Sequence, residues 1–316
     1  MSLYRDALPQ LKNRLFLTDG GIETTLIFHD GLELPDFAAF HLLRTAAGQI
    51  ALRKYFASYV SVAQQFGTGI VLETATWRAN ADWARKLGYS DTELAAAIRE
   101  SVRLIEDLRP QFPSLTLVIS GCLGPRGDGY VPGATMTDSQ AADYHRAQIE
   151  TFAATSADLV TAFTINYLEE ALGIARAARD AGMPVVISFT VETDGTLPSG
   201  QSLSDAIEEV DASTGAYPSY YMLNCAHPTH FADTLRAGSK RWTSRLRGLR
   251  ANASRMSHAE LNEAPSLDTG DPAELGRQYA HLTTVLPHLN VMGGCCGTDD
   301  RHIASIAAEC APLFNR

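Results

Sequence analysis

Three cysteines of this chain are spaced so that they could bind a metal ion or react as thiols. Cys295 and Cys296 are adjacent in the apolar run "NVMGGCCG", and Cys225 lies earlier in "SYYMLNCAH". Adjacent cysteines rarely bridge each other, because the ring that they would close is strained. Three thiolates with a fourth position left open are typical of a catalytic zinc site, whereas structural zinc sites are usually closed by four protein ligands. The spacing therefore favours a Zn2+ site at Cys225, Cys295 and Cys296, with packing of the thiols in the core as the alternative.

The other two cysteines complete an odd set of five, which is not typical of a disulfide framework. We therefore expect a reducing, cytoplasmic location. Cys310 falls in the last predicted helix, where a core position is expected. Cys122 lies near the end of a predicted strand and either lines the active site or packs in the core.

The elements that must position these residues alternate regularly along the chain. Short β-rich runs are separated by amphipathic helical patterns such as 141–156 and 168–182. The runs cover 15–21, 69–77, 115–124, 157–165, 184–191, 219–227, 245–253 and 290–297. This alternation predicts a (β/α)8 TIM barrel, formed by residues 1–316 as one domain. A doubly wound sheet is the alternative, but the stretch "DGGIETTL" lacks the G-x-G-x-x-G spacing that usually follows its first strand.

In such a barrel the catalytic residues lie in the turns that follow the strands. Cys225 ends the sixth predicted strand, and Cys295 and Cys296 end the eighth, so only one strand separates them and a single ion should reach all three. The loop 121–133 is rich in glycine and proline and is predicted to cover the barrel mouth. The polar and special residues at the predicted turns are Asp19, Glu73, Thr74, Cys122, Asn166, Cys225, Asn252, Cys295 and Cys296.

Composition excludes several classes of partner. The 26 basic and 36 acidic residues give a net charge of −10, which argues against nucleic acid as a ligand. No apolar run is long enough for a transmembrane helix, and the polar start "MSLYRDALPQLKNRL" is unlike a secretory signal. We expect small molecules as partners, and the sequence does not predict an oligomeric state.

Five stretches resemble the homocysteine S-methyltransferase family, in the same order and over nearly the whole chain. They are "LTDGGIETTL", "ISGCLGPRGDGY", "SFTVETDGTLPSGQSLSDAI", "LNCAHP" and "MGGCCGT". The resemblance implies a TIM barrel with zinc ligands Cys225, Cys295 and Cys296, and with Asp19 holding the amino group of the substrate. It also implies methyl transfer to homocysteine, or to a related thiol or selenol, giving methionine. The chain has no room for folate or cobalamin modules, so the donor implied is S-methylmethionine or S-adenosylmethionine.

The expected chemistry follows from the metal. A thiol bound to zinc loses its proton, and the thiolate attacks a methyl group carried by a positive sulfur. Because the displacement is in line, correct placement of donor and thiolate supplies much of the acceleration. Trp77 and Tyr130 either face the cationic donor or pack beneath the loops. Thr164 and Asn252 complete the predicted substrate-binding set.

One departure from the family pattern concerns the acceptor. The family often has Glu-Thr at the end of the fourth strand, where this chain has Phe163 and Thr164. A buried ammonium would then lack one acidic partner, which is costly. Glu73 is the candidate substitute, and the alternative is that Glu73 is a charge on the outer surface of the barrel.

Two other functions stay open on the sequence: a zinc-thiolate barrel that binds a small thiol without methyl transfer, and a redox protein that uses Cys295 and Cys296 as a dithiol. His227 and His230 are expected to line the pocket or cap the next helix rather than bind metal. Asp299 and Asp300 are interpreted as charges at a helix N-terminus.

Overall fold

Eight parallel strands close into a barrel in the order of the chain. The structure is a computed structural model that describes residues 1–264 and 266–314. The strands are β1 (Phe16–Thr18), β2 (Gly69–Glu73), β3 (Leu117–Leu123), β4 (Leu159–Ile165), β5 (Val185–Phe189), β6 (Tyr220–Asn224), β7 (Leu246–Ala251) and β8 (Val291–Gly294). Because β8 pairs with β1, the sheet has no free edge. The predicted TIM barrel is therefore confirmed, and the doubly wound alternative is wrong.

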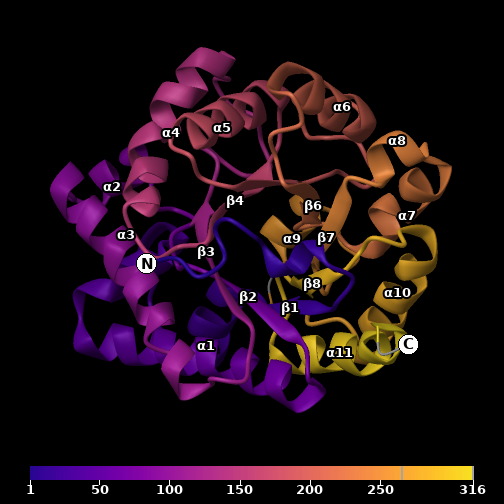
Figure 1. Cartoon of the computed structure of the whole chain (residues 1–316), viewed down its shortest axis with the longest axis horizontal. Coiled ribbons are helices and arrows are strands. Elements are labelled where there is room, and N and C mark those ends of the chain that lie inside the picture. Colours follow the sequence, from indigo (N-terminus) through magenta and orange to yellow (C-terminus); the bar gives the residue numbers. More distant parts are fainter. Residues whose placement is uncertain (265, 315–316) are drawn as a thin grey trace.

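Helices surround the barrel on its outside, as Figure 1 shows. The long ones are α1 (Ala46–Phe66), α3 (Asp91–Glu106), α4 (Asp138–Ala153), α5 (Leu168–Asp180), α6 (Leu203–Thr214), α7 (Pro228–Ala237), α10 (Pro272–Val285) and α11 (Asp300–Phe314). Short helices α2 (Ala81–Lys86), α8 (Lys240–Thr243) and α9 (His258–Glu263) lie in the connections. Local sequence sets several of these ends: Ser90 and Glu93 form a capping box, and Gly182 follows α5 in the left-handed conformation.

The core has two parts because each strand is covered on both faces. Leu17, Ile70 and Leu72 belong to the larger cluster between the strands and the helices. Their neighbours Phe16 and Val71 belong to a smaller cluster with residues of β3, β4, β5, β6 and β8. Successive side chains of a strand point to opposite faces, so this smaller cluster fills the barrel interior.

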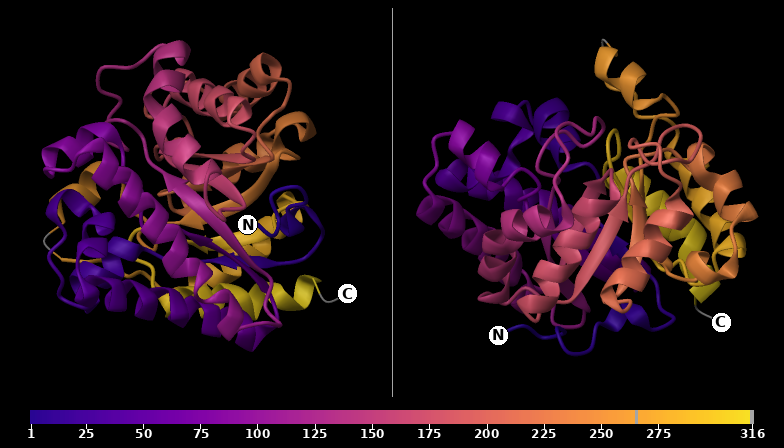
Figure 2. Two further views of the ribbon diagram at one scale, coloured as in Figure 1. Left: turned by 60° about the vertical axis from the view of Figure 1, so that its left-hand side comes forward. Right: turned by 90° about the horizontal axis from the view of Figure 1, so that it is seen from above.

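The N-terminal segment closes the end of the barrel where the strands begin. Asp158, just before β4, is fully buried and accepts hydrogen bonds from the backbone N–H groups of Leu3 (2.9 Å), Tyr4 (2.8 Å) and Ile119 (2.9 Å). The Arg109 guanidinium pairs with the same carboxylate. The right-hand view in Figure 2 shows both chain ends on one side of the molecule. The other end of the barrel is thus left for the βα loops.

The predicted strands were mostly too long at their C-terminal ends. The run 69–77 predicted one strand, but β2 ends at Glu73 and the next four residues form a turn. The run 219–227 likewise extends beyond β6, which ends at Asn224. The extra residues, 74–77 and 225–227, lie in the loops of the mouth. Among the residues that the structure describes, no helix is long and apolar enough to cross a membrane.

Candidate active site

The three predicted cysteines meet at the mouth of the barrel. Cys225 follows β6, and Cys295 and Cys296 follow β8. Their sulfur atoms all lie within 4.8 Å of one another. The prediction that only one strand separates them is correct, because β7 pairs with both β6 and β8.

Cys225 and Cys295 are joined as a disulfide in this structure, with Cα atoms 5.4 Å apart. The sequence led us to expect three free thiols and no disulfide. The bond forms between the two strand ends, and Cys296, the other member of the predicted Cys295–Cys296 dithiol, also belongs to the sulfur cluster. Cys296 and Cys122 stay free, and Cys310 is buried in α11 as expected.

The sulfur cluster fits a metal of the kind predicted. Zinc–sulfur bonds are about 2.3 Å, so two sulfurs on one ion lie at most about 4.6 Å apart. The three sulfurs, all within 4.8 Å of one another, can share one ion after small shifts of their side chains. Three sulfurs, with no fourth donor among the residues that the structure describes, leave one coordination position for a ligand. The Cys225–Cys295 bond must first be reduced, because metals bind thiolates.

Glycines near the double cysteine act through close packing and through a turn. Gly293 and Gly294 both belong to β8, where they pack closely against neighbouring side chains. A Cβ on Gly293 would overlap the Thr18 hydroxyl, and one on Gly294 would overlap the Thr298 hydroxyl. The turn itself is made by Gly297, with φ of 78°.

Asn252 ties the two cysteine segments together. Its amide nitrogen donates to the Cys225 carbonyl (2.9 Å), and its amide oxygen accepts from the Cys296 backbone N–H (3.1 Å). His258 Nε2 also lies 2.6 Å from the Cys225 carbonyl oxygen. We predicted that Asn252 contacts substrate. Its observed contacts hold the sulfur ligands in place, and its contact with substrate stays a prediction.

Two residues with left-handed backbone lie beside the sulfurs. Thr164 has φ of 60° and Cys225 has φ of 56°, values that are uncommon outside glycine. The side chain of Asn224 accepts from the Thr164 N–H (2.9 Å) and donates to the Thr164 hydroxyl (2.9 Å). The Thr164 hydroxyl then lies 4.0 Å from Cys225 Sγ. Strained residues held by their surroundings are typical of functional sites.

Asp19 is buried and already paired. Its carboxylate accepts from the Arg250 guanidinium (2.8 Å) and from the Tyr55 hydroxyl (2.8 Å). The Arg250 guanidinium also lies 5.0 Å from the centre of the Phe163 ring. The residue that departs from the family pattern thus faces a buried cation. The ion pair between Arg250, on β7, and Asp19, after β1, was not predicted from the sequence.

Glu73 is a buried acid with an unused oxygen. It is 5% exposed, so the interpretation as a surface charge is wrong. Its Oε2 atom has no hydrogen-bond partner among the described residues. Burial raises the pKa of Glu73 to about 8, although the charge of Arg250 opposes this shift. The carboxyl is therefore largely protonated at neutral pH.

Glu23 is an acid that our sequence reasoning missed. It precedes the π-helix η2 (Thr24–His29), and its neighbour Thr24 accepts a hydrogen bond from the Gly297 N–H (3.0 Å). Burial raises the pKa of Glu23 to about 7. The motif "DGGIET" contains two acids, and only Asp19 was considered.

The covering loop lies over the sulfur cluster; it was predicted at 121–133 and spans 124–133, because residues 121–123 belong to β3. Tyr130 places its hydroxyl 3.6 Å from Cys296 Sγ, and its ring lies 4.1 Å from that of His258. The Asn166 side chain donates to the Asp128 carbonyl (3.0 Å), which fixes the loop. Tyr130 therefore contacts the candidate site directly.

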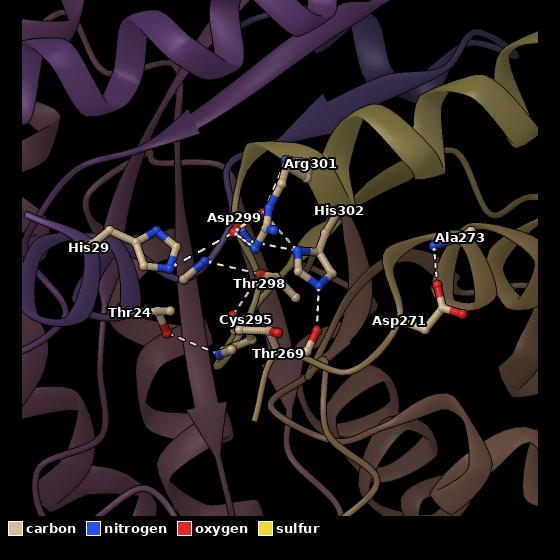
Figure 3. A network of polar contacts seen from close by, with 12 residues as sticks. Thr24, His29, Thr269, Asp271, Ala273, Cys295, Thr298, Asp299, Arg301 and His302 are labelled. Carbon is tan, nitrogen blue, oxygen red and sulfur yellow. Dashed lines mark hydrogen bonds and ion pairs between the residues drawn. The ribbon is translucent and has the colours of Figure 1, made fainter. Parts of the chain in front are cut away.

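The residues after the double cysteine are structural, as predicted. Asp299 precedes α11 and pairs with Arg301 (2.6 Å) and His302 (2.9 Å). Figure 3 shows this carboxylate together with His29, which lies 4.0 Å away. His227 caps α7 through Nδ1, so its predicted capping role is also correct.

The fold and the site define a TIM-barrel enzyme whose catalytic face carries three sulfurs that could hold a metal. A family model described as homocysteine S-methyltransferase matches residues 16–310. Because that match covers nearly the whole chain, the protein belongs to the homocysteine S-methyltransferase family and is a methyltransferase.

Individual proteins that resemble this chain are also homocysteine methyltransferases. "Homocysteine S-methyltransferase 4" of Zea mays is 26% identical over 317 residues, which cover 92% of this chain and 88% of that protein. Among solved structures, the metallated form of the homocysteine methyltransferase MmuM from Escherichia coli has a TM-score of 0.72 at 19% identity. Its oxidized form has a TM-score of 0.75 at 20% identity, and both matches cover 96% of this chain and 98% of the other. At these identities the two structures support the fold alone.

Proposed function

We propose that this protein is a zinc-dependent S-methyltransferase of the cytoplasm. It moves a methyl group from a sulfonium donor, S-methylmethionine or S-adenosylmethionine, to homocysteine or a related thiol or selenol. The convergence of the Cys225, Cys295 and Cys296 sulfurs within 4.8 Å carries this proposal. A reducing compartment would keep these cysteines as free thiols, which lose their protons when they bind the metal.

Zinc bound to three thiolates would remove the proton of the acceptor thiol and keep its sulfur nucleophilic. The residues of the chain hold the metal ligands and the acceptor in position. Asn252 and His258 hold the Cys225 backbone, and Asn252 also holds that of Cys296. Thr164 borders Cys225 Sγ at 4.0 Å and is placed to line the acceptor position. Positioning of this kind lowers the barrier of an in-line displacement.

Of the two acids predicted to bind the amino group of the acceptor, the contacts favour Glu73. Asp19 already accepts from Arg250 and Tyr55, whereas Oε2 of Glu73 is unpartnered. An approaching ammonium would favour the ionised form of Glu73 and form a charge-assisted hydrogen bond. Asp19 then acts by fixing Arg250.

The test is a transfer assay on reduced, zinc-loaded enzyme. Homocysteine is incubated with S-methylmethionine or with S-adenosylmethionine, and products are identified by mass spectrometry. We expect methionine from at least one donor, without folate or cobalamin. If no thiol or selenol in a panel is methylated, a zinc-thiolate barrel that only binds thiols becomes the better account.

A further inference from the structure

A buried arginine lies between two tryptophans beside the candidate active site. The Arg78 guanidinium carbon is 4.2 Å from the centre of the Trp77 ring and 4.1 Å from that of the Trp83 ring. Trp77 and Arg78 follow β2, and Trp83 belongs to α2. Arg78 is 8% exposed. We call these three residues the Trp–Arg–Trp cluster.

Each residue of the Trp–Arg–Trp cluster carries a buried N–H group that has no acceptor among the described residues. These groups are Nε1 of Trp77, Nε of Arg78 and Nε1 of Trp83. Buried donors are normally paired, because an unpaired one loses its hydrogen bonds to water. Three such donors and no unpaired acceptor among the cluster's own side chains form a lining suited to an anion.

The positive charge of Arg78 has no ion-pair partner. In the part of the chain that the structure describes, no carboxylate oxygen lies within 4.0 Å of its guanidinium. Asp128 and Glu23 act on Arg78 only from farther away. Its Nη1 atom donates to the Gly127 carbonyl (3.0 Å), which leaves the rest of the guanidinium available. Arginine binds carboxylates well because its planar group offers several donors.

The cluster lies next to the sulfurs. A Cβ added to Gly129 of the covering loop would be 2.6 Å from Thr164 Cγ2 and 3.3 Å from Trp77 Cζ2. Trp77 and Thr164 therefore border the same glycine. Thr164 in turn lies 4.0 Å from Cys225 Sγ. A small molecule with its sulfur at the cysteines has the cluster within its reach.

We propose that the Trp–Arg–Trp cluster binds the carboxylate of a substrate whose sulfur lies at the cysteine site. The proposal rests on the proposed function for the identity of that substrate. Homocysteine and both candidate donors are amino acids with a carboxylate, so either acceptor or donor could supply it. The subsite makes an anionic end, in addition to the thiol, a determinant of specificity.

Arg78→Gln tests the acceptor. We expect the KM for homocysteine and for 3-mercaptopropionate to rise at least tenfold, with little change for 2-mercaptoethanol, which lacks a carboxylate. Arg78→Lys should recover part of the loss, because it keeps the charge. Arg44→Gln is the matched control, since Arg44 also stacks on an aromatic ring, that of Tyr89 (3.6 Å). Its kinetics should be unchanged.

A second arm tests the donor. S-methylmethionine carries a carboxylate and trimethylsulfonium does not, so comparing them in Arg78→Gln shows whether the donor's carboxylate is the one bound. A selective loss with either carboxylated partner supports the subsite. Equal losses with charged and neutral partners would mean that Arg78 only supports the fold, and would overturn it.

Binding without turnover separates the two proposals. Two of the three tryptophans of the chain belong to the cluster. Titration of reduced protein with 3-mercaptopropionate should therefore change tryptophan fluorescence, and 1-propanethiol or Arg78→Gln should abolish the change. If this signal appears without methyl transfer to any acceptor, the proposed function fails and the subsite stands. If methyl transfer proceeds and the signal is absent, the subsite fails alone.

Discussion

Two buried carboxyl groups at opposite ends of the barrel differ in how fully they are hydrogen-bonded. Asp158, at the closed end, accepts from three backbone N–H groups and pairs with Arg109. Glu73, at the mouth, is also buried, yet its Oε2 atom has no partner. Burying an unpaired polar group costs free energy. The closed end is thus built for stability, whereas the mouth leaves polar groups free for a ligand.

The contrast extends to the backbone. Thr164 and Cys225 adopt positive φ at the mouth, beside the unpartnered groups. Strain and unpaired groups persist only where the rest of the fold supplies the stability. Changes at the mouth should therefore affect function more than stability, and changes at the closed end should do the reverse.

The largest effect is expected at the cysteines. Cys296→Ala should reduce bound zinc from about one per chain to near zero and lower methyl transfer by at least about 100-fold, because one metal ligand is lost. The midpoint of thermal unfolding should change little, since a barrel of this size does not depend on metal for its core. Metal analysis, kinetics and calorimetry measure these quantities.

Cys310→Ala is the matched control, because Cys310 is fully buried in α11. It should keep its zinc and activity and lose about 1 kcal/mol of stability. Full zinc occupancy in the Cys295→Ala, Cys296→Ala double variant would show that the metal binds elsewhere.

At the closed end, Asp158→Asn should have the opposite effect. Removing one partner of a buried ion pair typically costs about 3–5 kcal/mol, because the remaining charge is left unpaired. Urea unfolding should show a loss of about that size, while kcat/KM of the folded enzyme stays within about twofold. A large loss of catalytic rate with unchanged stability would contradict the division between the two ends.

Glu73→Gln tests the unpartnered acid through the pH dependence of stability. The pKa of Glu73 is raised to about 8 in the folded protein, from 4.5 in the unfolded chain. Between these values the unfolded chain releases this proton and the folded protein keeps it, so stability falls as pH rises, by up to about 1.4 kcal/mol per pH unit.

The Glu73→Gln variant should therefore lose less stability than the wild type between pH 5.5 and pH 8. Part of the slope should remain, because the pKa of Glu23 is raised to about 7 and acts in the same window. Identical slopes for variant and wild type, measured by urea unfolding, would mean that Glu73 is not held protonated by burial.

The smallest effect is expected at Tyr130. Its hydroxyl lies 3.6 Å from Cys296 Sγ, and a single hydrogen bond is worth about 0.5–1.5 kcal/mol. Tyr130→Phe should weaken zinc binding by about two- to tenfold, as measured by competition with a chelator. A change of several hundredfold would instead place the hydroxyl on the metal.

The sequence predicts the fold well because the strand and helix patterns are local. It also predicts that Cys225, Cys295 and Cys296 meet, since strand order alone places them. Arg250 could not be predicted to pair with Asp19, nor Trp83 to stack on Arg78. Those contacts depend on side-chain packing between distant elements, which no local pattern encodes.

The ends of the strands were also poorly predicted from the sequence. The predicted runs continue beyond β2 and β6 because the turn residues are as apolar or β-branched as the strands. The sequence left two interpretations of Glu73 open, a surface charge and a substrate-binding acid. The burial of its side chain in the structure excludes the surface charge. Phe163 was identified as a departure, but its contact with Arg250 required the assembled barrel.

The most direct test of the metal site is X-ray absorption at the zinc edge, on reduced protein before and after addition of homocysteine. We expect three sulfur ligands on the zinc, all from the protein, and a fourth sulfur ligand when homocysteine is bound. A spectrum dominated by nitrogen and oxygen ligands, or one that homocysteine leaves unchanged, would contradict the assignment of Cys225, Cys295 and Cys296 as the centre that binds the acceptor.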